Sequence, residues 1–133
     1  MPILYPYRLF ISHAWDYDED YYRLISMFDA YPNFDYKNYS VPKHDPFDSI
    51  WMLRQKLTNQ INPTQVVVVL AGMYAAHSDW IDYEIDEAVR LGKSIIGVRP
   101  WGQERIPSKV QKCATQIHGW NVAPIVESIR RLA

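Results

Sequence analysis

Hydrophobic residues recur along this chain with two different periods, and together they predict strands that alternate with helices. Short apolar runs predict strands at residues 7–12, 66–70, 94–98 and 116–118, and a weaker alternating segment spans 34–41. Apolar residues at helical spacing occupy 18–31, 49–62, 79–91, 108–112 and 123–132. This alternation predicts an α/β fold of flavodoxin-like architecture, a doubly wound five-stranded parallel sheet with strand order 2-1-3-4-5.

Polar residues and a glycine mark the ends of two predicted helices. Asp48 or Ser49 is expected to cap the second helix. Ser78 or Asp79 is expected to cap the third, which Gly92 ends in a left-handed conformation. These positions predict a third helix that begins at residue 79.

The third helix carries a carboxylate inside its apolar stripe. The stripe consists of Ile81, Ile85 and Ala88 at its centre, with Val89 on one flank and Leu91 and Trp80 on the other. Glu84 projects between Ile81 and Leu91, within this stripe. Because burial of an unpaired carboxylate costs several kcal/mol, Glu84 has either a structural partner or a place in the wall of a cavity that a ligand enters. We favour the cavity, since perturbed acids cluster at functional sites.

The predicted topology places other polar residues at the same edge of the sheet. In doubly wound sheets, ligands bind outside the carboxyl ends of the strands, where the strand order reverses. That edge carries residues 12–16 after the first strand, 43–45 after the second and 71–74 after the third. Glu84 is expected about one turn inside the helix that follows. Across one crevice, the residues expected to face each other are Ser12, His13, Trp15 and Asp16 on one side and Ser78, Trp80, Tyr83 and Glu84 on the other.

Composition narrows the classes of partner. The 133 residues predict one domain, 1–133. A formal net charge of -1 gives no basic surface for nucleic acid or an anionic membrane. The single cysteine, Cys113, excludes an internal disulfide, and no apolar stretch approaches the length of a membrane span. With no basic, apolar leader at residues 1–6, a soluble cytoplasmic protein is expected.

The sequence lacks the residues that several other classes of protein require for their function. Strand 66–70 is followed by Ala71-Gly72 rather than the aspartate of a phospho-receiver, and no glycine-rich phosphate loop occurs. The four histidines, His13, His44, His77 and His118, show no metal-ligand spacing, so neither a metal nor a resident cofactor is expected. Ser12 and His13 are adjacent on a strand without a nucleophile elbow, which argues against a serine hydrolase.

The segment Ser78-Asp79-Trp80-Ile81-Asp82-Tyr83-Glu84 resembles the S-x-W-x-x-x-E segment of TIR domains. Phe10-Ile11-Ser12-His13, the strand at 66–70 and the stretch 92–102 extend the similarity to the TIR-like proteins of the bacterial Thoeris antiphage system. The resemblance implies an enzyme that cleaves the nicotinamide glycosidic bond of NAD and makes a signalling nucleotide from the ADP-ribose part. It also implies that Glu84 is the catalytic residue, in an NAD glycohydrolase or ADP-ribosyl cyclase.

The chemistry of NAD is compatible with a single carboxylate. Nicotinamide leaves as a neutral molecule from a cationic precursor, so no general acid is needed, whereas O-glycosidases need one. Glu84 would stabilise the oxocarbenium-like charge that develops at the anomeric carbon. In this interpretation Trp80 and Tyr83 shape the wall, Ser12, His13 and Trp15 hold the nicotinamide or ribose side, and Arg99 meets phosphate. Alternatively, Trp80 is a core aromatic, His13 a loop residue, Arg99 a surface charge and Glu84 structural.

Other functions stay open at this point. The loop at residues 41–46 lacks the Arg-Asp and Pro-Gly dipeptides common in TIR adaptor proteins, so adaptor partners are not carried over. One alternative is a non-catalytic TIR-like interaction module, in which Glu84 pairs with His13 or Arg99. Another is an enzyme like the nucleoside deoxyribosyltransferases, in which a Glu attacks the anomeric carbon.

The resemblance also bears on product and partners. The product is expected to be cyclic, although linear and conjugated products stay open, and the expected partner is a separate effector protein reached through this diffusible nucleotide. Self-association on activation is a further expectation of the resemblance.

Overall fold

Strands and helices alternate in the computed structural model, which describes residues 6–12, 19–40, 49–70, 74–99 and 106–133, without the side chains of 20, 50 and 74–80. The strands are β1 (Tyr7–Ile11), β2 (Tyr36–Asn38), β3 (Val66–Leu70), β4 (Ser94–Val98) and β5 (Gln116–His118). The helices are α1 (Glu19–Ala30), α2 (Ile50–Ile61), α3 (Tyr74–Arg90), α4 (Ser108–Cys113) and α5 (Val122–Leu132).

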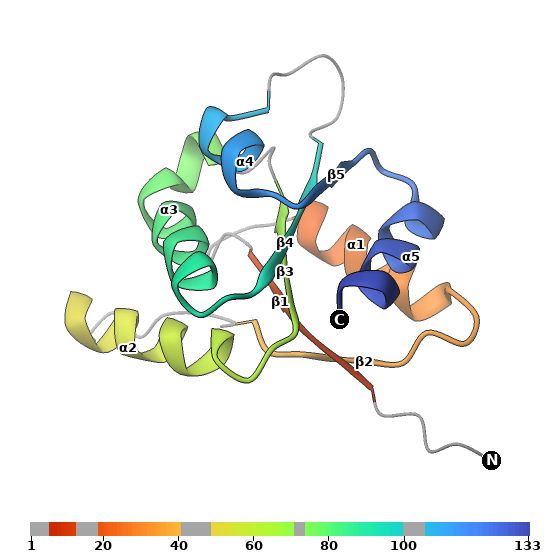
Figure 1. The fold of residues 1–133 in the computed structure, drawn as a ribbon, viewed down its shortest axis with the longest axis horizontal. Helices are drawn as coiled ribbons and strands as arrows, with labels where there is room; N and C mark the ends of the chain where they lie inside the picture. Colours follow the sequence, from red (N-terminus) through yellow and green to blue (C-terminus); the bar gives the residue numbers. More distant parts are fainter. Residues whose placement is uncertain (1–5, 13–18, 41–48, 71–73, 100–105) are drawn as a thin grey trace.

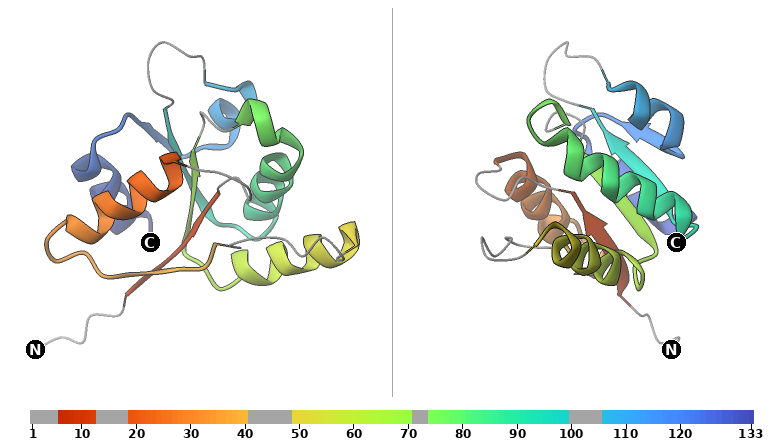
Figure 2. Two further views of the ribbon diagram at one scale, coloured as in Figure 1. Left: turned by 180° about the vertical axis from the view of Figure 1, so that it is seen from behind. Right: turned by 90° about the vertical axis from the view of Figure 1, so that its left-hand side faces the viewer.

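The five strands form one parallel sheet in the order β2-β1-β3-β4-β5, which confirms the predicted topology. Helices α2 and α3 cover one face of the sheet and α1 and α5 cover the other, while α4 packs against α3 and β4 (Figure 1). Figure 2 shows the same layers from two further sides, with α2 and α3 side by side. The fold is therefore the expected flavodoxin-like α/β architecture.

The centre of the sheet is the most apolar part of the chain. All five residues of β3 are buried, because helices cover both faces of this strand. On the neighbouring strand β4, a Cβ atom at Gly97 would lie 2.9 Å from Cγ1 of Val110. The missing side chain at Gly97 thus allows α4 to pack directly onto the sheet.

Two predicted helix ends are confirmed by their local geometry. Ser49 caps α2, since its hydroxyl accepts a hydrogen bond of 3.1 Å from the backbone N–H of Met52. Gly92 follows α3 with a φ of 72°, the left-handed conformation that a residue without a Cβ adopts at low cost.

Helix α3 begins earlier than the sequence predicted. It starts at Tyr74, so the prediction of a cap at Ser78 or Asp79 was wrong. Residues 74–77 contain two alanines and no helix breaker, and alanine has the highest helix propensity, so the helix extends through Ser78 and Asp79. Glu84 consequently lies ten residues after Tyr74, about 15 Å along the helix axis rather than about one turn.

The edge strand β2 is shorter than the predicted strand at 34–41. Its regular pairing covers Tyr36–Asn38, and single hydrogen bonds extend it to Asp35 and Tyr39. Phe34 instead stacks on Tyr36, with ring centroids 5.4 Å apart. Aromatic packing therefore replaces strand pairing at the start of this segment.

No helix among the described residues is both long and apolar enough to cross a membrane.

Candidate functional site

The buried face of α3 is centred closer to Glu84 than the sequence pattern predicted. Among residues 81–90 of the helix, whose side chains the structure describes, those that are buried are Ile81, Glu84, Ile85, Glu87 and Ala88. At about 100° per residue they span an arc of roughly 160°, with Glu84 near its middle. Val89, predicted on the flank of the buried stripe, is 54% exposed, so that prediction was wrong. The buried arc is displaced toward Glu87 because α2 covers that side of α3.

The Glu84 side chain is buried without a hydrogen-bond partner for one of its oxygens. It is 3% exposed, and Oε2 has no partner among the described residues. Burial raises the pKa of Glu84 from 4.5 to about 8, because an apolar environment disfavours the charged carboxylate. At neutral pH most Glu84 side chains are therefore protonated. A buried acid that only stabilises the fold is normally hydrogen-bonded, and the described residues supply no such partner to Oε2 of Glu84.

The position of Glu84 on α3 shows which neighbours surround it. Ile81 and Ala88 face the sheet core, and Glu87 faces α2, where it accepts a hydrogen bond from Thr58. At about 100° per residue, Glu84 lies between these two directions. The helical period thus places Glu84 on the side of α3 that faces the corner where α2, α3 and the sheet meet. Since α2 joins β2 to β3 and crosses β1, this corner lies on the β1 side of β3.

Ser12 lies at the carboxyl end of β1, as predicted, and is buried. Its N–H donates to the carbonyl of Val68 at 2.9 Å, and its hydroxyl oxygen accepts from the N–H of Leu70 at 3.3 Å. These two bonds fix Ser12 at the switch point between β1 and β3. Its hydroxyl proton takes no part in either bond and can be donated to a ligand.

Tyr83 of α3 contacts α2, and Arg99 directly follows β4. The Tyr83 hydroxyl lies 2.9 Å from Oγ1 of Thr58 and 3.2 Å from the carbonyl oxygen of Arg54, so its ring points toward α2. Arg99 is exposed at the carboxyl end of β4, and its N–H donates to the carbonyl of His118 at 2.7 Å. Ser12 and Arg99 therefore share one edge of the sheet, separated by β3.

The remaining predicted site residues lie outside the described side chains. His13, Trp15 and Asp16 fall in the undescribed segment 13–18, and the loop residues 43–45 and 71–73 are also undescribed. Ser78 and Trp80 belong to α3, but their side chains are not described. Their predicted roles stay predictions.

The sequence interpretation missed Glu87, a second buried carboxylate that is 9% exposed. Its Oε2 accepts a hydrogen bond of 2.7 Å from the hydroxyl of Thr58, and Arg90 donates two bonds of 2.8 and 2.7 Å. These partners hold the pKa of Glu87 below its usual value, with the bonds from Arg90 as the largest cause. In the sequence, Glu87 and Arg90 are three residues apart, a spacing that predicts an ion pair on a helix.

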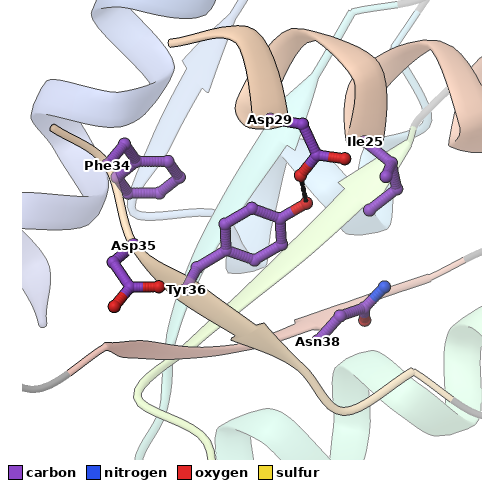
Figure 3. Close-up of a pocket in the computed structure, with 6 residues that line it drawn as sticks. All are labelled: Ile25, Asp29, Phe34, Asp35, Tyr36 and Asn38. Carbon is purple, nitrogen blue, oxygen red and sulfur yellow. Dashed lines mark hydrogen bonds between the residues drawn. The ribbon is translucent and has the colours of Figure 1, made fainter. Parts of the chain in front are cut away.

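A groove of about 550 Å³ lies elsewhere, between the end of α1 and β2 (Figure 3). It is lined by Ile25, Asp29, Phe34, Asp35, Tyr36 and Asn38. The Tyr36 hydroxyl donates to Asp29 at 2.8 Å, and Tyr36 pairs with Tyr7 at the amino end of β1. This groove therefore lies away from the strand ends at which parallel sheets bind ligands, and it contains none of the predicted site residues.

A family model described as "Thoeris protein ThsB, TIR-like domain" matches residues 10–105. The chain belongs to this family. Membership in the Thoeris TIR-like family supports a role in antiphage defence and is consistent with NAD-cleaving activity. A comparison with curated proteins gives no match.

The region matched by the Thoeris TIR-like family extends from β1 to the residues that follow β4. It includes Ser12, Glu84 and Arg99, and leaves out α5. The described part of this Thoeris TIR-like chain holds no group of three or more potential metal ligands. Among the histidines, His118 lies outside the match and bonds through Nε2 to the Ser128 hydroxyl at 2.6 Å.

Proposed function

We propose that this protein cleaves the bond between nicotinamide and ribose in NAD, with Glu84 as the catalytic residue. The observation that supports this function best is the buried, unpartnered Oε2 of Glu84 in a member of the Thoeris TIR-like family. The corner between α2, α3 and the sheet would receive the nicotinamide riboside part of the substrate. Ser12 would bind the same part from β1, and Arg99 would meet the phosphates.

The proposed reaction breaks the bond between the anomeric carbon and the ring nitrogen of nicotinamide. Both electrons of this bond go to nitrogen, so the cationic ring leaves as neutral nicotinamide without a proton. The positive charge moves to the ribose as an oxocarbenium-like cation, which the Glu84 carboxylate stabilises. A nucleophile then attacks the anomeric carbon. Water gives ADP-ribose and a proton, whereas a nucleophilic atom of the adenine would give a cyclic product, the outcome that we favour.

Glu84 has to be ionised to stabilise this charge. Its pKa of about 8 means that the empty protein holds a neutral acid at neutral pH. A nicotinamide cation in the same corner would favour the carboxylate and lower the pKa of Glu84, because opposite charges in a dry site attract strongly. Substrate binding would thereby create the ionised form that the reaction needs.

The nucleotide product is proposed to leave the protein and act on a separate effector protein. No nucleic acid, membrane or resident cofactor is part of this proposal.

The test incubates the purified protein with NAD, with and without lysate from phage-infected cells, and resolves the products by mass spectrometry. Glu84→Gln removes the carboxylate and keeps its shape. Asp86→Asn makes the same change two residues along α3, where the side chain is 65% exposed and forms an ion pair with Lys109. We expect nicotinamide and an ADP-ribose derivative from the wild type and from Asp86→Asn. Loss of one carboxylate aimed at the developing charge is expected to reduce turnover by about 10²–10³-fold in Glu84→Gln.

Two outcomes would replace this function. If NAD survives every condition while free nucleosides exchange their bases, the protein is an enzyme like the nucleoside deoxyribosyltransferases. If neither substrate reacts and the protein is folded, Glu84 is structural.

A specific observation favours an interaction module as the second candidate function. Trp51 is 71% exposed near the start of α2, and Met52 beside it is also exposed. Such side chains are frequent at protein interfaces. This candidate predicts self-association that Trp51→Ser weakens, measured by sedimentation, together with no turnover of NAD.

A further inference from the structure

Helices α2 and α3 are joined by a chain of hydrogen bonds that passes through one hydroxyl. Oγ1 of Thr58 lies 2.7 Å from Oε2 of Glu87 and 2.9 Å from the hydroxyl oxygen of Tyr83. Glu87 is an ionised acceptor with a lowered pKa, so Thr58 donates its only hydroxyl proton to Glu87. Towards Tyr83, Thr58 can then only accept, and the single hydroxyl proton of Tyr83 is shared between Oγ1 of Thr58 and the more distant carbonyl oxygen of Arg54. The direction of the chain is Tyr83 to Thr58 to Glu87.

The two α3 residues in this chain enclose Glu84 in the sequence. Tyr83 directly precedes Glu84, and Glu87 lies about one turn after it. Because Thr58 holds both residues, α3 is attached to α2 at two points along its length. Two points of attachment restrict both sliding and rotation of α3 relative to α2.

Further contacts stiffen each end of the chain. The guanidinium of Arg54 lies 5.5 Å from the centre of the Tyr83 ring, and the backbone carbonyl of Arg54 is 3.2 Å from the Tyr83 hydroxyl. At the other end, Arg90 binds both oxygens of Glu87. On another side of α3, Lys109 pairs with Asp86 at 2.8 Å, but the Asp86 side chain is 65% exposed, so this pair holds the helix less firmly.

We propose that Thr58 is a positioning residue for Glu84, which holds α3 at the rotation that keeps the Glu84 carboxyl group in the corner between α2, α3 and the sheet. A side chain at about 5–6 Å from the helix axis moves by about 1 Å when the helix turns by roughly 10°. Displacements of about 1 Å at a reacting centre can cost about a hundredfold in rate. The effect on catalysis rests on the proposed function, whereas the effect on the position of Glu84 does not.

The experiment compares four full-length proteins: the wild type, Thr58→Val, Thr58→Ser and Thr64→Val. Thr58→Val should fold, because Glu87 keeps Arg90 and Tyr83 keeps the Arg54 carbonyl as partners. Thr58→Ser retains the hydroxyl. Thr64→Val is the matched control, since it removes a buried hydroxyl just beyond the end of α2. Among the described residues, this hydroxyl donates to the Ile61 carbonyl at 2.6 Å and has no hydrogen bond with α3. If Thr58→Val does not fold, Tyr83→Phe interrupts the same chain at its other end.

Two measurements are made on each protein. The first is the titration of the Glu84 carboxyl group by carbon NMR, and we expect its midpoint to fall by at least about one pH unit in Thr58→Val alone, as the group leaves its dry corner. The second is NAD turnover, with kcat expected to fall at least about tenfold in Thr58→Val and KM to change less than about twofold. Thr58→Ser and Thr64→Val should match the wild type in both.

A Thr58→Val protein in which Glu84 titrates as in the wild type overturns the proposal, and so does a loss of kcat that Thr64→Val reproduces. If the wild type does not cleave NAD, the proposed function fails, and the titration alone decides the role of Thr58.

Discussion

Glu84 and Glu87 lie about one turn apart on the buried face of α3, yet their environments differ completely. Glu87 has three hydrogen bonds from Thr58 and Arg90, and its pKa is lowered. Oε2 of Glu84 has no partner among the described residues, and its pKa is raised to about 8. The comparison teaches that hydrogen-bond partners decide whether a buried acid is held in its charged form and stabilises the fold.

The largest expected effect is on the pH dependence of stability. Since the folded state raises the pKa of Glu84 from 4.5 to about 8, the folded protein binds this proton more tightly than the unfolded chain. The favourable contribution is complete below pH 4.5 and is lost as the pH rises to about 8, by up to about 5 kcal/mol. Urea unfolding should show that Glu84→Gln removes this slope. An equal slope in the variant would assign the pH dependence to other groups.

The next effect concerns activity. If Glu84 acts as a carboxylate, kcat/KM for NAD should rise about tenfold per pH unit well below pH 8 and level off near it, a rise of about fiftyfold between pH 6 and pH 8. The profile of kcat should be displaced to lower pH, because the bound nicotinamide cation favours ionised Glu84. Rates of NAD loss across this range test both statements. A kcat/KM profile that is flat from pH 6 to pH 8 contradicts them.

Glu87→Gln should change stability in the direction opposite to Glu84→Gln. It removes the charge that Arg90 and Thr58 bind, and we expect a loss of about 1–2 kcal/mol at pH 7, limited by the exposure of Arg90. The contribution of Glu87 is present above its unfolded pKa of 4.5 and is lost as the pH falls through its lower folded pKa. Urea unfolding at pH 7 measures the difference. A Glu87→Gln protein as stable as the wild type would remove the contrast between the two acids.

The smallest effect on stability is expected from loss of the ion pair that the exposed Asp86 of α3 forms with Lys109. Lys109→Met deletes the ion pair with Asp86, whose side chain is 65% exposed, and should cost less than about 1 kcal/mol. Thermal unfolding in low and high salt provides the check, since added salt should reduce the difference between variant and wild type. If Lys109→Met loses as much stability as Glu87→Gln, solvent exposure does not explain a difference between the Lys109–Asp86 and Arg90–Glu87 pairs.

The fold could be predicted because its signals are local. The apolar run Val66–Leu70 and the alternation of strand and helix periods are properties of short segments, and they led to the observed strand order. The start of α3 could not be located in this way, because Ser78 and Asp79 are acceptable both as caps and inside the first turns of a helix.

The candidate site could be predicted only in part from such local signals. The helical period alone placed Glu84 inside the apolar stripe. The partner of Glu87 could not be found from the period, since Thr58 is 29 residues away and reaches Glu87 only after α2 packs on α3. The same packing explains why Glu87 is buried and Val89 is exposed, the reverse of their hydrophobicity.

The strand order also has a consequence for how the chain is made. Leu9 of β1 pairs with Val66 of β3. The ribosome therefore has to add 57 residues after Leu9 before β1 can begin to pair with β3. At about 5–20 residues per second, this delay is roughly 3–11 s. During synthesis β1 can pair only with β2, which leaves the other edge of β1 open. A nascent chain that stops before residue 70 is therefore expected to be a target for chaperones and proteases.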